Sequence, residues 1–256
     1  MIQVLGLRDW KKGDKVLKRE TFFSKGWRFP KVEEVFDSVK LDALLANVPE
    51  SERYNLYFTV AECYEESGRK LREQWAIPFD IDGLVLPEGG ELEAALKAAQ
   101  AGADALRVPL TEMGVVFTGN GVQFFILLDA PILDEEYFDR AREQYGVLAK
   151  RIQGLLMERG IEGNVDTSVW SRGRLMRLPH TLNRKPGKPE RMSRILNGTL
   201  VARSFDLEKE SGVTLAPAGD TMPDVVLKNY PKPDTDAVCT GCKFLSWCKD
   251  NPAIVS

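Results

Sequence analysis

The sequence feature that most constrains the fold is the segment GVVFTGNGVQFFILL, residues 114–128. Two apolar runs flank the tripeptide Gly119-Asn120-Gly121, and strand formers around such a turn are typical of a tight antiparallel β-hairpin. The turn also leaves backbone N–H groups uncovered by side chains, so it can approach a phosphate closely. We therefore expect antiparallel strands here, joined by a plain turn or by a phosphate-binding one.

Further strands are predicted on both sides of this hairpin. Residues 55–61 and 75–82 are apolar, aromatic and β-branched, and they predict two buried, neighbouring strands. Residues 165–178 alternate enough to supply further strand. Asn197-Gly198 lies between two short β-forming runs and predicts a second hairpin.

Two helices are predicted between the strands. Strong helix formers cover residues 91–101, with Gly102 just past the expected end. Asp134 is a suitable N-cap for a longer amphipathic helix that ends at Gly160. The mixture predicts an α+β fold in which a largely antiparallel sheet is flanked by helices.

The run IPFDIDGLV, residues 77–85, ends in two carboxylates separated by one residue. Because side chains alternate along a strand, Asp80 and Asp82 face the same way while Ile81 turns into the core. Two adjacent carboxylates repel each other unless a cation or a proton lies between them, and their oxygens suit Mg²⁺ or Mn²⁺. The alternative is a solvated strand end followed by a turn at Gly83.

Positive charge is concentrated in two segments of a chain whose net charge is −3. Residues 1–32 contain nine Lys and Arg against three acids, and residues 171–194 contain eight against Glu190 alone. Such clusters are expected where a polyanion binds, although a solvated basic loop is the alternative.

The segment DTSVWSRGRLMRLPHTLNRKPG, residues 166–187, resembles the third motif region of phage and plasmid primase-polymerases of the archaeo-eukaryotic primase superfamily. In that family an aspartate precedes a run of the form RLPGTxNxK. FDID at 79–82 resembles the first family motif, and FTGNGVQ at 117–123 resembles the second. The resemblance spans residues 55–200 and implies a core with an RRM-like sheet and an N-terminal α/β module. It implies a DNA primase or DNA polymerase that acts in phage or plasmid replication.

The resemblance also implies the site residues. The catalytic carboxylates, which would hold two Mg²⁺ or Mn²⁺ ions, are Asp80, Asp82 and Asp166. The nucleotide-binding residues are Thr118, Gly119, Asn120, Gly121, Gln123, Arg177, His180, Asn183 and Lys185. The DNA-binding residues are Arg172, Arg174 and Arg184. The implied partners are a single-stranded DNA template with its primer, an NTP or dNTP, and a replicative helicase that is fused or separate; we expect a monomer.

Two positions depart from the family pattern. Gln123 stands where the family usually has His, and its amide can donate a hydrogen bond but carries no positive charge. We therefore expect altered affinity for the triphosphate. His180 stands where the family usually has Gly; it is the one His of the chain, and it is either a contact to phosphate or metal or a plain surface residue.

The basic N-terminal segment, residues 1–32, is a candidate for tracking the single-stranded template. It contains aromatic side chains that could stack on bases or belong to the core, namely Trp10, Phe22, Phe23 and Trp27.

The first motif also fits a second class, the phosphatases of the haloacid dehalogenase superfamily. Their motifs are mimicked by Asp80 and Asp82, Thr118, Lys185 or Lys188, and GDTMPD at 219–224. The last of these should follow a buried parallel strand, but Pro217 interrupts the segment before it. That class also leaves Asp166 and RLPHTLNRK without a role. A catalytically silent module that binds a replication origin is the third hypothesis.

Three of the four cysteines form a C-x2-C-x5-C cluster: Cys239, Cys242 and Cys248. Clustered thiols in a cytoplasmic protein suggest zinc, but a structural zinc site needs four ligands. His180, Cys63 or a residue beyond Ser256 could supply the fourth. The alternative is a helix that buries the cysteines as small apolar residues.

The length of 256 residues suits one large domain with a small appendage. We expect a catalytic domain over residues 1–205, a linker or surface segment over 206–238, and the start of an accessory segment over 239–256. No apolar run approaches the roughly 20 residues that span a bilayer, and the N-terminus does not resemble a signal peptide. The expected location is the cytoplasm.

Overall fold

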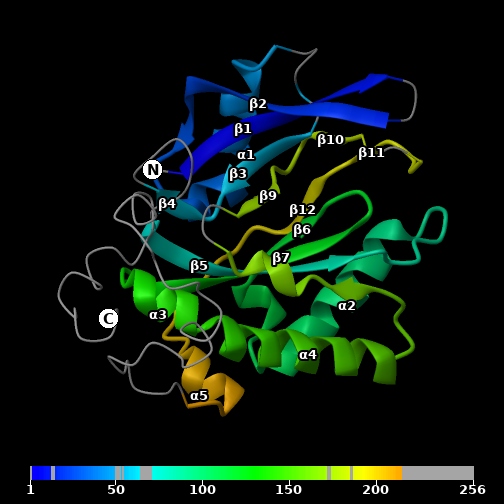
Figure 1. Ribbon diagram of the computed structural model, residues 1–256. Coiled ribbons are helices and arrows are strands. Elements are labelled where there is room, and N and C mark those ends of the chain that lie inside the picture. Colours follow the sequence, from blue (N-terminus) through cyan, green and yellow to red (C-terminus); the bar gives the residue numbers. More distant parts are fainter. Residues whose placement is uncertain are drawn as a thin grey trace, which may run out of the picture. The chain divides into compact units, whose positions relative to one another are not determined.

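The structure is a computed structural model (Figure 1). It describes residues 2–12, 15–49, 53, 55–63, 71–171, 174–184 and 187–214, without the side chains of residues 7–12, 15–27, 62–63, 71–72 and 135. The described residues all lie in the first of two units, Met1–Leu215. No helix within these ranges is long and apolar enough to cross a membrane.

The named strands form antiparallel sheets, which confirms the expected α+β class. The largest sheet has the order β12 (Arg194–Asn197), β6 (Gly114–Phe117), β7 (Gly121–Ile132), β5 (Leu71–Asp82), β4 (Ala61–Cys63), and β8 (Asn164–Val165) also pairs with β5. A second sheet has the order β2 (Lys15–Phe29), β1 (Ile2–Lys12), β3 (Leu56–Thr59), β9 (Leu175–Arg177), and β10 (Leu182–Asn183) pairs with β11 (Arg191–Met192). The predicted segment 55–61 therefore divides at Val60, and its second part, β4, neighbours β5.

The helices lie on both sides of the largest sheet. In chain order they are η1 (Val32–Phe36), α1 (Ser38–Ala46), α2 (Glu91–Leu106), η3 (Leu110–Glu112), α3 (Glu135–Arg140), α4 (Arg142–Glu158), η4 (Thr167–Val169) and α5 (Leu207–Ser211). Helices α2 and α4 lie side by side across one face (Figure 1). The opposite face of β7 contacts η1 and β3, where the ring of Phe125 lies 5.2 Å from that of Phe36 and 5.7 Å from that of Phe58.

The predicted hairpin at 114–128 is confirmed as β6 and β7. Phe117 pairs with Val122, and the Thr118 N–H donates to the Gly121 carbonyl across the turn. Gly121 is also the partner of Asp82 in β5, and a Cβ at this position would overlap the Ile81 carbonyl oxygen. A glycine is therefore required where the hairpin meets the end of β5.

Both predicted helices are present, with different bounds. Helix α2 continues past Gly102 to Leu106, so this glycine is not a helix end; it leaves room for the ring of Phe124 on β7, which a Cβ there would overlap. The long helix is capped by Asp134, as predicted, but it is interrupted at Ala141 and divides into α3 and α4.

The strand predicted within residues 165–178 is confirmed in part: Val165 ends β8 and Leu175–Arg177 form β9, while the Asp166 side chain caps η4 between them. One strand prediction was wrong. The hairpin predicted at Asn197-Gly198 is absent from the described residues. The Asn197 amide instead donates to the carbonyls of Leu110 and Met113, and β12 pairs with β6.

The first part of the predicted linker is ordered as helix α5. Asp206 caps it, Leu207 is buried, and the Gln144 amide of α4 donates to the Val213 carbonyl just beyond it. Residues 215–256, with the rest of the linker and the cysteine cluster, lie outside the described residues. The predicted domain boundaries therefore remain predictions.

Candidate active site

Strand β5 carries Asp80 and Asp82 at its C-terminal end. Ile81 between them is fully buried, in agreement with the predicted alternation. Asp80 pairs in register with Gln123 of β7, and the Gln123 amide donates to Asp80 Oδ2 over 3.3 Å. The backbone N–H of Arg177 in β9 donates to Gln123 Oε1 over 3.0 Å. Gln123 therefore connects the carboxylate of one sheet to the backbone of the other.

The third carboxylate, Asp166, is held next to Asp80 by the backbone. Strand β8 pairs with the end of β5, so that Val165 lies opposite Ile81. The next N–H, that of Asp166, donates to the Asp80 carbonyl over 2.9 Å. The structure thus brings together two carboxylates that are far apart in the sequence.

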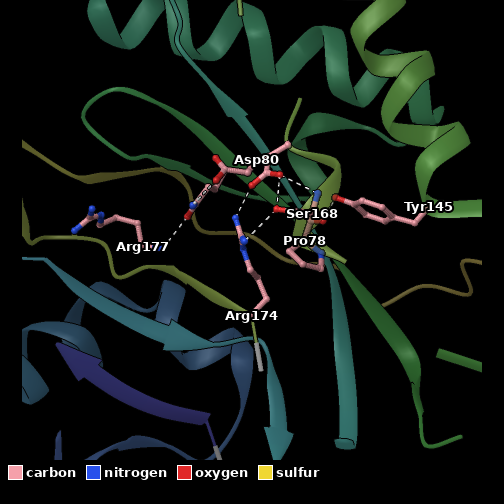
Figure 2. A network of polar contacts seen from close by, with 8 residues as sticks. Pro78, Asp80, Tyr145, Ser168, Arg174 and Arg177 are labelled. Atoms are coloured by element: carbon pink, nitrogen blue, oxygen red, sulfur yellow. Dashed lines mark hydrogen bonds and ion pairs between the residues drawn. The ribbon is translucent and has the colours of Figure 1, made fainter. Parts of the chain in front are cut away.

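The side chain of Asp166 has partners on both oxygens (Figure 2). The backbone N–H and the hydroxyl of Ser168 donate to Oδ1 over 2.8 and 2.6 Å, and Arg174 donates to Oδ2 over 2.6 Å. Arg174, which was predicted to bind DNA, therefore lies within the carboxylate cluster. Its Nε is buried and lacks a hydrogen-bond partner.

The surroundings change the pKa values of two of the carboxyl groups in opposite directions. Burial, reinforced by the charge of Asp82, raises the pKa of Asp80 to about 7. Burial would also raise the pKa of Asp166, but the hydrogen bonds from Ser168 and the charge of Arg174 outweigh it and lower that pKa. Near neutral pH, Asp80 is thus poised to exchange a proton while Asp166 is ionised.

The donor set suits a hard divalent cation. Carboxylate oxygens are the ligands that Mg²⁺ and Mn²⁺ prefer, and Asp80 Oδ1 is buried without a hydrogen-bond partner. The described ranges nevertheless contain no group of three or more His, Cys, Asp or Glu side chains already arranged around a metal position. A cation that joined all three carboxylates would have to compete with Arg174 for Asp166.

Arg177 is a buried cation with neutral partners. Its guanidinium donates to Asn55 Oδ1, to the Tyr57 hydroxyl and to Asn183 Oδ1 over 2.8 to 3.1 Å, and it lies 4.3 Å from the centre of the Tyr57 ring. Its burial lowers its pKa, which the nearby charge of Asp80 partly offsets. The polar side of β5 therefore faces a fixed positive charge.

The turn of the hairpin is tied to the same network. The Asn183 amide donates to the Thr118 carbonyl over 2.6 Å, and Arg191 donates to the Gly119 carbonyl over 3.2 Å. Gly119 has a positive φ of 92°. These contacts bring together five of the predicted nucleotide-binding residues: Thr118, Gly119, Gln123, Arg177 and Asn183. The sequence did not predict that these residues hold one another in place.

His180 lies at the edge of this group. It adopts a left-handed conformation, φ 59°, which explains why a glycine would fit this position. Its Nδ1 lies 2.8 Å from Asp42 Oδ1, so its ring is engaged with α1. Arg184 forms an ion pair with Glu190. Arg172 and Lys185 lie outside the described residues.

Sequence reasoning missed several residues that build the site. The contact with Ser168 had a usable signal, because Asp is favoured at a helix N-cap, where its side chain accepts from a backbone N–H two or three positions later. Asn55 and Tyr57, which hold Arg177, had none. Tyr145 lies within the predicted long helix, and its hydroxyl donates to the Pro78 carbonyl behind Asp80 over 2.9 Å, a contact that the sequence did not indicate (Figure 2).

Comparisons with known proteins give structural neighbours but no sequence match. No protein-family profile and no curated protein matches the chain. A primase-polymerase AEP domain of cyanophage S-2L aligns over 82% of this chain and 88% of its own, with 16% identity and a TM-score of 0.46. The polymerase domain of Mycobacterium tuberculosis ligase D, solved in complex with DNA, aligns over 81% of this chain and 69% of its own, with 15% identity and a TM-score of 0.40. At these values the function has to be inferred from the residues of the site.

Proposed function

We propose that this chain is a nucleotidyltransferase of the primase-polymerase kind, which extends a primer along a single-stranded DNA template in phage or plasmid replication. The observation that carries the proposal is the hydrogen bond from the Asp166 backbone to the Asp80 carbonyl. It joins the first and third motifs, 84 residues apart in the sequence, at one strand end where Asp80 has a buried oxygen without a partner.

Asp80, Asp82 and Asp166 would hold two Mg²⁺ or Mn²⁺ ions. Bound divalent cations would supply activation of the primer 3′-hydroxyl and stabilisation of the departing pyrophosphate. Because the pKa of Asp80 is about 7, this carboxyl must lose its proton before it can bind a cation. Gln123 orients Asp80 for this role, and Arg177 supplies a fixed positive charge toward the triphosphate.

The remaining assignments stay proposals. Residues 118–121, His180, Asn183 and Lys185 are proposed nucleotide contacts, and Arg172, Arg174 and Arg184 are proposed DNA contacts. Zinc binding by the cysteine cluster and association with a helicase are proposed on the sequence alone.

The phosphatase hypothesis is less well supported. Strand β5, which carries Asp80 and Asp82, is antiparallel to each of its partners β4, β7 and β8. The phosphatase motifs also give no reason for Asp166 to lie beside Asp80. The segment 219–224 that would complete that motif set lies outside the described residues.

Primer extension with labelled nucleotides, single-stranded template and Mg²⁺ or Mn²⁺ tests the proposal. We expect extension by the wild-type chain and a loss of about 10³-fold or more in Asp166→Asn, equivalent to about 4 kcal/mol of transition-state stabilisation. Asp129→Asn, an exposed carboxylate at the far end of β7, is the matched control and should retain activity. Release of phosphate from a small ester without nucleotides, equal in wild type and Asp166→Asn, would contradict the proposal.

A further inference from the structure

A pocket of about 250 Å³ opens beside Asp82. Its polar wall consists of Asp82, Asn120 of the hairpin turn, Lys188 and Arg191, and Leu84 and Leu86 contribute apolar surface. Pockets that enclose a drug-sized ligand measure roughly 300–1,000 Å³, so this pocket fits part of a nucleotide rather than the whole.

The side chain of Asn120 gives the first indication that the pocket binds a ligand. The residue is only 8% exposed, and its Nδ2 amide is buried with no hydrogen-bond partner. A buried amide without a partner costs about 1–3 kcal/mol, so it is rarely left in place unless something else uses it. The amide is a donor, and it therefore requires an acceptor such as a phosphate oxygen.

The cations of the pocket are the second sign. Elsewhere in the basic segment, Arg174 is paired with Asp166 and Arg184 with Glu190. Lys188 and Arg191, by contrast, form no ion pair with any described residue, and the one hydrogen bond of Arg191 goes to the neutral Gly119 carbonyl. Both charges remain available to an anion.

Two described side chains that the family pattern assigns to the nucleotide, Gln123 and Arg177, are already engaged. The Gln123 amide donates to Asp80, and its carbonyl oxygen accepts from the Arg177 backbone. The Arg177 guanidinium is distributed over three neutral acceptors. The phosphate charge must therefore be met largely by other residues.

We infer that the pocket beside Asp82 binds the phosphate tail of a nucleoside triphosphate, with Lys188 and Arg191 as its cationic contacts and the Asn120 amide as a donor. This inference deepens the proposed function and rests on it. Asp82 on one wall is one of the carboxylates proposed to hold a divalent cation, so a phosphate tail bound in this pocket would lie beside that cation. Lys188 and Arg191 would thus supply a positive charge to the phosphates that Gln123, in place of the family's usual His, does not carry.

Calorimetric titration with magnesium tripolyphosphate, which has no base or sugar, tests the inference directly. We expect Lys188→Ala and Arg191→Ala each to weaken binding about tenfold, as for the loss of one charged hydrogen bond, and Lys188→Arg to restore most of it. Lys150→Ala and Arg142→Ala remove exposed cations from α4 and should leave binding unchanged. In primer extension, Lys188→Ala and Arg191→Ala should raise the KM for the nucleotide with little change in kcat.

Two results would overturn the inference: no binding of tripolyphosphate by the wild type, or binding within twofold of wild type in Lys188→Ala, Arg191→Ala and their double variant. Failure of the proposed function is distinguishable from these. If the wild type binds tripolyphosphate through Lys188 and Arg191 but extends no primer, the phosphate pocket is supported and the proposed polymerase activity is refuted. If the wild type extends primers, and Lys188→Ala and Arg191→Ala leave both extension and tripolyphosphate binding unaffected, the polymerase activity is supported and the phosphate pocket is refuted.

Discussion

The two faces of the β5–β7 strand pair differ: one is packed with aromatic rings, and the other carries the polar site. On the helix side, Phe79 stacks on Phe124 and on Tyr145 with ring centres 5.2 and 5.0 Å apart, and all three are fully buried. On the other side, one residue along each strand, Asp80 meets Gln123 and retains a buried oxygen without a partner. A single register therefore places a packed core and an incompletely satisfied polar site back to back.

The difference between these faces explains how a raised pKa can persist. The rings of Phe124 and Tyr145 pack against Phe79 of β5, so the strand does not rearrange to relieve the burial of Asp80. Aromatic packing on the helix side stabilises the strand pair, and the fold therefore tolerates the buried carboxylate of Asp80 on the polar side. Variants that alter one face at a time should separate stability from activity.

The largest effect on stability is expected from Phe79→Ala on the helix side. It removes a fully buried ring between Phe124 and Tyr145, and it should lower the free energy of unfolding by about 3 to 5 kcal/mol, or the Tm by about 10 °C. Denaturant unfolding measures the loss. Met157→Ala, which truncates an exposed apolar side chain, is the control and should change stability by about 0.5 kcal/mol or less. A loss from Phe79→Ala no larger than that of the control would contradict the role of this face.

A smaller and opposite effect is expected from Asp80→Asn on the polar side. The pKa of Asp80 is raised from 3.8 to about 7, so the folded protein binds this proton more tightly than the unfolded chain does. The stability of the metal-free wild type should therefore fall as the pH rises from about 4 to about 7. Asn does not ionise, so above pH 7 the variant should be more stable by about 2 to 4 kcal/mol while it loses activity.

Unfolding of both proteins in chelator at several pH values checks this prediction, with Asp129→Asn as the control for loss of an exposed carboxylate. The stability difference between Asp80→Asn and wild type should disappear near pH 4. A difference that does not depend on pH would show that Asp80 is not a strained carboxylate.

The sequence was most informative where one local rule decides the outcome. Strand formers around Gly119 to Gly121 predicted the hairpin, and alternation predicted that Ile81 is buried between two carboxylates. Asp134 was predicted as a cap from its residue type and the pattern after it. These are the features for which residue chemistry within a few positions fixes the backbone.

Features that depend on distant residues could not be predicted in this way. Gly102 has the residue type of a helix end, yet it is in mid-helix because Phe124, on another strand, needs the space. Asn197-Gly198 has the form of a hairpin turn, but the Asn197 amide donates to the carbonyls of Leu110 in η3 and of Met113 just after it. Arg174 resembled a free DNA contact, and only the fold places Asp166 within 2.6 Å of it.

The most direct test of the account is a crystal structure grown with Mn²⁺ and a non-hydrolysable nucleoside triphosphate, with anomalous scattering used to locate the manganese. We expect manganese peaks between Asp80, Asp82 and Asp166, with Arg174 withdrawn from Asp166. A fully bound nucleotide with no manganese at these carboxylates, and with the Arg174 to Asp166 ion pair intact, would contradict it.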